Sequence, residues 1–161
     1  MRIAEKVASS IGKGLVAGLA GTAAMTLSST LEARLRHRAP SSAPARATAK
    51  ALGITSFEND IAQARFSDLS HWGYGTGLGA VRGLLDAAGL PPRAATAAHG
   101  AAVWGSEQVA LPALDSAPPA IFWAPREIAI DAFHHTVYAL ATGIAYELLG
   151  GRRGTSGGVA P

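Results

Sequence analysis

The chain has 161 residues and a net charge of +3, and only 16% of its residues are charged, against about 25% in an ordinary soluble domain. Its Lys and Arg residues lie in short groups beside apolar segments, so we expect no nucleic-acid partner. The absence of Cys excludes disulfides, thiolate metal sites and thiol nucleophiles. This composition permits a membrane protein, and the length favours a single domain.

The first apolar segment, from Ile11 to Leu31, is nearly uncharged. At about 1.5 Å per helical residue it is long enough to cross a hydrocarbon core of roughly 30 Å. Gly14, Gly18 and Thr22 recur every four residues and form a ridge of small side chains suited to close helix packing. A basic group follows like a stop-transfer flank, so we favour a membrane span over a signal peptide here.

Residues 32–68 form a polar, Pro-containing connection. Within it, residues 45–52 suit a short helix with two open placements; in one, an amphipathic helix lies on the membrane surface with Arg46 and Lys50 facing lipid head groups. The alternative is a solvated helix that packs on the bundle.

The second apolar segment, residues 69–90, ends at a pair of Pro residues. Gly75, Gly79 and Gly83 recur every four residues, and each costs a water-exposed helix roughly 1 kcal/mol relative to Ala. A tightly packed membrane interface explains this pattern best. Arg82 is expected to pair with Asp86 one turn on and to extend toward the head groups; a substrate-binding Arg is the less favoured alternative.

Two further spans are predicted at residues 94–114 and 127–149. Phe122 and Trp123 lie in the connection between them and suit the membrane interface. We expect one domain over residues 1–150 and a flexible tail over residues 151–161. Basic residues are nearly equal in number on the two sides of these spans, so the positive-inside rule leaves sidedness open. Of the two orientations that remain open, we favour the one with both termini in the cytoplasm.

The second and fourth spans carry the same pattern, a His-x2-Tyr-x4-Gly helix repeated at an offset of 64 residues. The repeat aligns His71 with His135, Tyr74 with Tyr138, and Gly79 with Gly143. We therefore predict an all-α, four-helix transmembrane bundle built from two helix-pair halves. The repeated helices run in the same direction, the first span packs with the second and the third with the fourth, and Gly143 takes part in helix packing.

Ionisable residues inside a span are costly and are therefore functional candidates. The predicted topology brings five of them to one leaflet, where His71 and His135 approach each other as a pair beside Glu107. The five are His71, Glu107, Asp131, His134 and His135.

Three interpretations of this polar cluster compete. In the favoured one, hydrogen bonds between imidazole and carboxylate fix the helix register. In the second, His71, Glu107 and His135 bind a divalent metal such as zinc, although no H-E-x-x-H motif is present. In the third, the cluster relays protons along a path that His99 and Tyr138 extend.

The sequence contains no P-loop, no G-x-S-x-G and no dinucleotide fingerprint, so we assign no catalytic residue and favour a protein that is not an enzyme. We expect a structural or interaction module in the membrane, with lipid and a second copy or another membrane protein as partners and without a cofactor. The alternatives are an oligomer that conducts protons or small solutes, and a metal-binding membrane enzyme.

Four stretches carry a resemblance to a known family: GLVAGLAGTAAMT, HWGYGTGLGAVRGLL, WGSEQVALPAL and HHTVYALATGIAYELL. In these stretches the chain resembles the YagU-like group of small bacterial inner-membrane proteins, whose function is unknown. The resemblance covers most of the chain apart from the first connection and the tail. It departs from the family at Glu107, where related sequences can carry His. It implies a multi-pass protein of the bacterial inner membrane and brings no settled activity.

Overall fold

The computed structural model describes residues 3–39 and 41–151. Its long helices are α1 (Ile3–Leu35), α3 (Asp60–Ala87), α4 (Pro92–Ala113) and α5 (Pro125–Tyr146). The shorter elements are α2 (Ala43–Ala51), the 3-10 turn η1 (Ala120–Phe122) and the π-type segment η2 (Glu147–Gly151). Over these described residues the chain contains no strand, which confirms the prediction of an all-α protein.

The four long helices fall on the four apolar segments, but α3 begins at Asp60 instead of residue 69. Asn59 has extended backbone and caps this helix, because its side-chain oxygen accepts the Ala62 N–H at 2.9 Å. The cap extends α3 into the stretch that we predicted as polar connection. Residues 152–161 of the predicted tail lie outside the described residues.

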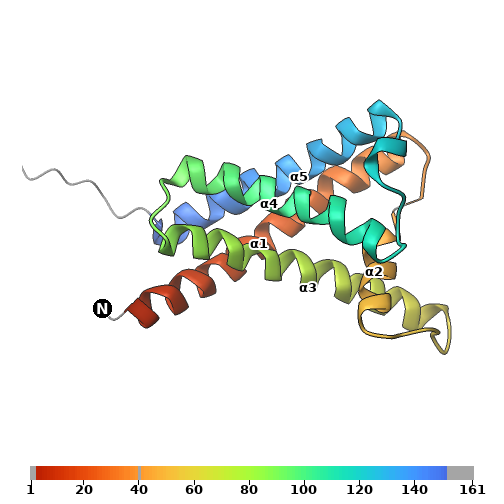
Figure 1. Ribbon diagram of the computed structural model, residues 1–161, viewed down its shortest axis with the longest axis horizontal. Helices are drawn as coiled ribbons and strands as arrows, with labels where there is room; N and C mark the ends of the chain where they lie inside the picture. The colour runs from red at the N-terminus through yellow and green to blue at the C-terminus, as the bar shows by residue number, and fades with distance from the viewer. Residues whose placement is uncertain (1–2, 40, 152–161) are drawn as a thin grey trace, which may run out of the picture.

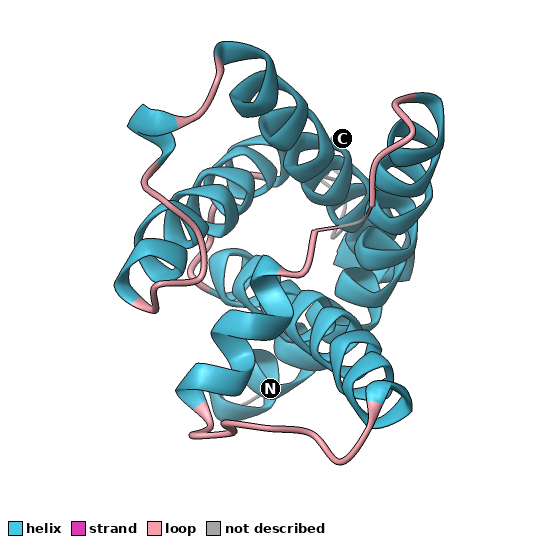
Figure 2. Ribbon diagram, turned by 90° about the vertical axis from the view of Figure 1, so that its right-hand side faces the viewer, coloured by secondary structure: helices cyan, strands magenta, loops and turns pink. Residues whose placement is uncertain are grey.

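The long helices form an antiparallel bundle in which α1 packs against α3 and α5, and α4 packs against the same two helices (Figure 1). The predicted parallel direction of α3 and α5 follows from this arrangement. At one end, here called the α2 end, Lys50 of α2 donates to the Asp115 carbonyl in the connection between α4 and α5 at 2.9 Å. Figure 2 looks onto this end. At the opposite end, Lys6 of α1 donates to the Ala87 carbonyl of α3 at 3.0 Å.

Small residues allow α1 and α3 to cross at close range. A Cβ added to Gly18 would lie 2.8 Å from the Cα of Gly79, and a Cβ added to Gly79 would overlap the Gly14 carbonyl oxygen. Farther along the same contact, Gly75 lies against Thr22 and Gly83 against the backbone of Ser10. The two ridges of small residues therefore lie against each other, as membrane helices with such ridges commonly do.

The helix pair α4 and α5 repeats this packing with fewer glycines. Gly143 of α5 lies against the Thr96 side chain of α4, and a Cβ on Gly100 of α4 would lie 3.0 Å from the Ala139 Cβ. The predicted pairing of first with second and third with fourth helix is thus present. Tyr74 and Tyr138 depart from the repeat, because the first is 51% exposed and the second is 2% exposed.

Helix α2 packs on the bundle, and the expected surface helix over residues 45–52 is wrong in its orientation. Ala43 and Ala47 are buried against Leu111 of α4. Arg46 donates to the Ser116 carbonyl at 2.7 Å, so its charge is directed at the connection between α4 and α5 instead of lipid head groups. Helix α2 therefore matches the other prediction, a helix that packs on the bundle.

The interior of the bundle combines small and apolar residues with several polar side chains, and many large apolar side chains lie on its surface. Four polar side chains are almost completely buried: Thr22, Arg82, His99 and Thr142, at 1%, 1%, 0% and 0% exposure. Large apolar side chains project outward from every long helix, including Leu27 of α1, Leu69 of α3, Val109 of α4 and Ile144 of α5, each more than half exposed. Buried polar side chains together with many exposed large apolar ones depart from the usual pattern of a water-soluble domain.

Among the described helices, α1 alone is long and apolar enough to cross a bilayer. Only 28% of the most apolar 18-residue stretch of α1 is buried inside the protein. A signal sequence near the N-terminus, or the core helix of a soluble protein, meets the same criterion of length and composition. The other three predicted spans do not reach that criterion, and each contains ionisable residues.

Candidate functional site

The structure divides the predicted polar cluster among different helix contacts. His71 lies between α3 and α1, where its Nε2 is 2.8 Å from Thr26 Oγ1. The ligand atoms that gather elsewhere belong to Glu107, Asp131 and His135, without His71. The expected pairing of His71 with His135 is therefore wrong, because each repeated His faces the first helix of its own pair.

Glu107, Asp131 and His135 form a compact group, here called the α4–α5 triad. His135 Nε2 lies 2.7 Å from Glu107 Oε2, and one potential ligand atom from each residue lies within 4.8 Å of the others. Asp131 and His135 are one turn apart on α5, and Glu107 reaches them from α4. Helix periodicity placed Asp131 and His135 on one face, and antiparallel packing brought Glu107 to it.

Two hydrogen bonds orient the triad. His135 Nδ1 lies 2.9 Å from the Asp131 backbone carbonyl, which can only accept, so Nδ1 carries the proton. Trp104 donates its indole N–H to Asp131 Oδ2 at 2.7 Å. His135 Nε2 is thereby directed at Glu107, and Asp131 Oδ1 is left on the side of the imidazole, 3.6 Å from Nδ1.

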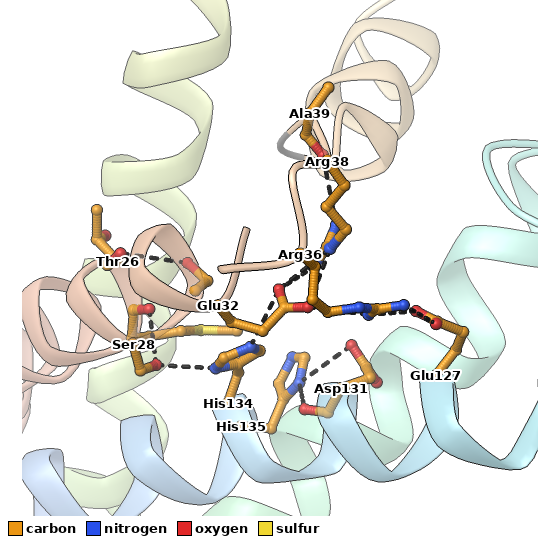
Figure 3. Close-up of polar contacts among 12 residues, drawn as sticks. Thr26, Ser28, Glu32, Arg36, Arg38, Ala39, Glu127, Asp131, His134 and His135 are labelled. Carbon is orange, nitrogen blue, oxygen red and sulfur yellow. Dashed lines mark hydrogen bonds and ion pairs between the residues drawn. The ribbon is translucent and has the colours of Figure 1, made fainter. Parts of the chain in front are cut away.

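His134 belongs to a separate group between α5 and α1 (Figure 3). Its Nδ1 lies 2.9 Å from Ser28 Oγ, and its Nε2 lies 3.8 Å from Glu32 Oε2. The side chain of the adjacent His135 extends toward Asp131 in the same view. The two neighbouring histidines thus serve different helix contacts, as their angular separation of about 100° on a helix requires.

A network of ion pairs links α1 to α5 at the α2 end, and it was not predicted from the sequence. Glu32 lies 2.9 Å from Arg36 and 2.5 Å from Arg38, and Arg36 also lies 2.5 Å from Glu127 of α5. The hydrogen bond from Arg38, helped by Arg36, lowers the pKa of Glu32 to about 2. The i,i+4 spacing of Glu32 and Arg36 was the one visible signal, since the partner on α5 is far away in sequence.

His99 and Tyr138 meet inside the bundle, with their ring centroids 5.5 Å apart. His99 Nε2 lies 3.2 Å from the Leu78 carbonyl, and the Tyr138 hydroxyl donates to the Gly75 carbonyl at 2.6 Å. Both side chains thus use α3 backbone as a partner. Across the described residues, no hydrogen bond links His99 to His71 or to His135.

Arg82 is buried, and its expected extension toward head groups is wrong. Its guanidinium lies over the Tyr146 ring, 4.5 Å from the centroid. The Tyr146 hydroxyl donates to Asp86 Oδ2 at 2.9 Å. Tyr146 therefore contacts both charged residues, and Arg82 and Asp86 do not form the predicted direct ion pair.

Two hollows reach the α4–α5 triad. A cavity of about 370 Å³ at the α2 end is lined by Glu107, Asp131 and His134 together with Arg38 and Glu127. A more apolar groove of about 570 Å³ along the outer face of α4 and α5 is lined by Trp104 and His135. The triad is therefore accessible to a small ion from the polar end of the bundle.

The chain matches no protein-family model, no curated protein and no solved structure. The resemblance to the YagU-like group therefore stays a prediction, and the functional argument depends on the residues themselves.

Proposed function

We propose that this chain is an integral membrane protein whose four long helices all cross the bilayer, and that it acts there as a structural or interaction module. The observation that supports this proposal is that every long helix buries at least one polar side chain and exposes large apolar ones.

The physical reason is the solvent that each surface prefers. In water, apolar side chains gain roughly 25 cal/mol for each Å² of surface that they bury, so a soluble bundle would turn Leu27, Leu69 and Ile144 inward. In lipid no such driving force exists between helices, and association depends on close packing of small residues and on interhelical hydrogen bonds. The Gly contacts between α1 and α3 supply the close packing, and hydrogen bonds such as that from the Tyr138 hydroxyl to the Gly75 carbonyl link the helices.

The outward apolar faces would contact lipid, a second copy of the chain or another membrane protein. Following the resemblance to the YagU-like group, we place the protein in the bacterial inner membrane. The proposed role includes no catalysed reaction, and the sequence contains none of the catalytic motifs considered above.

The chain has no Cys, so single Cys substitutions can map its topology without background labelling. We choose Ser56→Cys in the connection before α3, Ala88→Cys after α3, and Ala124→Cys before α5, which are all exposed. Each variant is expressed in bacteria and labelled in intact cells with a membrane-impermeant maleimide, and permeabilised cells serve as the control for reactivity.

If all four helices cross, Cys at residues 56 and 124 will be labelled from one side of the membrane and Cys at residue 88 from the other. If only α1 crosses, all three positions will lie on the same side, and the four-span proposal will be wrong. Recovery of the chain in the soluble fraction without detergent would contradict membrane insertion altogether.

A further inference from the structure

The α4–α5 triad places one imidazole and two carboxylates at a distance that suits a single cation. Its three candidate ligand atoms lie within 4.8 Å of one another. Side-chain torsions can reduce such separations to the roughly 3.3 Å expected between ligands that lie about 2.0–2.2 Å from one zinc ion. All three side chains are at least partly buried, so they are held by packing and do not move freely in solvent.

The hydrogen bonds prepare the ligand atoms. His135 donates its Nδ1 proton to the Asp131 carbonyl, which is the usual way in which proteins fix a histidine that binds metal through Nε2. Trp104 donates to Asp131 Oδ2, so Oδ1, which lies 3.6 Å from His135 Nδ1, is the oxygen that would turn toward an ion. These partners are supplied by residues of α4 and α5 alone.

The charge balance also favours a cation. When His135 is neutral and its proton is on Nδ1, its Nε2 carries a lone pair. This lone pair faces Glu107 Oε2 at 2.7 Å, and because an ionised carboxylate oxygen is also an acceptor, the two atoms repel each other. A proton between them removes that repulsion but leaves the triad with one uncompensated negative charge. A divalent cation with a neutral imidazole balances both carboxylates. Among the described residues, the ion pairs of Glu107 and Asp131 are with His135 and include no Lys or Arg.

We propose that Glu107, Asp131 and His135 form a binding site for a divalent transition-metal ion of the zinc type, reached through the cavity at the α2 end. The nitrogen ligand separates this site from Mg²⁺ and Ca²⁺ sites, which use oxygen ligands. With three protein ligands, a fourth position remains for water or another small ligand. His71, which the sequence suggested as a ligand, contacts Thr26 of α1 and is not part of this group.

Zinc binding to the detergent-purified chain tests the site. The protein carries an affinity tag without His, and zinc affinity and stoichiometry are measured by titration and elemental analysis. We expect close to one ion per chain, which excess Mg²⁺ does not displace. His135→Ala and Glu107→Gln should each weaken binding at least tenfold, since loss of a supporting residue alone typically weakens metal binding 10- to 100-fold.

Two variants serve as controls. His71→Ala removes a histidine at the same level of the bundle and should leave zinc affinity unchanged. Trp104→Phe keeps all three ligands but removes the hydrogen bond to Asp131, and should weaken binding roughly tenfold or more. Circular dichroism and size exclusion verify that each variant is folded, and the nearly isosteric Glu107→Gln covers the case in which His135→Ala does not fold.

The proposal is overturned if the folded wild-type chain binds no zinc, if the triad variants bind as tightly as the wild type, or if His71→Ala loses binding to the same degree. The measurement uses purified protein and does not depend on the number of spans, so its failure would leave the topology proposal untouched.

Discussion

Tyr146 shows how one buried side chain can accommodate two charges. Its ring lies under the Arg82 guanidinium and its hydroxyl donates to Asp86. The only other hydrogen bond to the Asp86 carboxylate in the described part of the chain comes from Ser10, at a weak 3.4 Å. Asp86 therefore depends on Tyr146 for its best donor.

Tyr146→Phe keeps the ring beneath Arg82 and removes only the hydroxyl. We expect the variant to lose about 1–3 kcal/mol of stability, because a partly buried carboxylate loses a hydrogen bond. Thermal or denaturant unfolding in detergent measures the loss. Tyr74→Phe is the matched control, since Tyr74 is half exposed on the surface of α3, and it should change stability little. Equal stability of both variants would contradict this account of Asp86.

At the scale of single residues, the sequence predicted which side chains are unusual but not what they contact. Glu107, Asp131 and His135 were recognised as ionisable residues within apolar segments. Periodicity alone placed Asp131 and His135 on one face of α5. Which histidine Glu107 would meet depended on the rotation of α4 and α5 about their axes, and no local signal reports that rotation. The rotation of α3 about its axis was equally unknown, which is why Arg82 was expected to extend toward head groups although it is buried.

The helix pair α1 and α3 illustrates packing at the scale of elements. Glycines of α3 fall into two rows, and only the row containing Gly75, Gly79 and Gly83 faces α1. A Cβ on Gly77, in the other row, would meet no atom within 4 Å. The row that faces α1 is the one that the sequence predicted to pack, and the structure shows that its partner is the Gly14 and Gly18 ridge.

Gly79→Ala should destabilise the protein by about 1–3 kcal/mol, because the new methyl group overlaps the Gly14 backbone and forces α1 and α3 apart. Gly77→Ala should be neutral or stabilising by up to about 1 kcal/mol, since Ala favours the helix and the position is open. Unfolding of the two variants, measured side by side, gives the comparison. If Gly79→Ala were as stable as Gly77→Ala, the close crossing would be wrong.

Other elements show where local signals failed. The N-terminus of α3 follows from the Asn59 cap, a local signal that lay outside the apolar segment used to place the helix. Helix α2 was found within one or two residues, but its docking on α4 depends on contacts more than 60 residues away in sequence. Secondary structure was therefore predictable, and the contacts between elements were predictable only where a repeat or a Gly ridge indicated them.

For the molecule as a whole, the ion pairs at the α2 end join the end of α1 to the start of α5. Glu32 lies beyond the apolar segment 11–31, and its pKa falls from an ordinary 4.5 to about 2 through Arg38 and Arg36. A carboxyl whose folded pKa is depressed contributes stability that is fully present above the unfolded pKa. That contribution is lost as the pH falls from about 4.5 toward 2.

Thermal unfolding across this acid range tests the network. The wild type should lose stability between pH 4.5 and pH 2, and Glu32→Gln should be less stable at neutral pH and show a flatter pH dependence. Glu58→Gln, at an exposed position in the connection before α3, is the control and should follow the wild type. Parallel pH profiles for the wild type and Glu32→Gln would show that the network does not stabilise the fold.

The position of α1 between α3 and α5 has a consequence for biosynthesis. A ribosome completes α1 first, but its two partners end at residues 87 and 146, so its second packing face stays open until almost the whole described chain has been made. Until then Ser28, Glu32 and Arg36 lack the α5 side chains that they contact in the finished bundle. A nascent chain halted before α5 would therefore expose these polar groups, and we expect quality-control proteases to degrade such truncated products faster than the full-length protein.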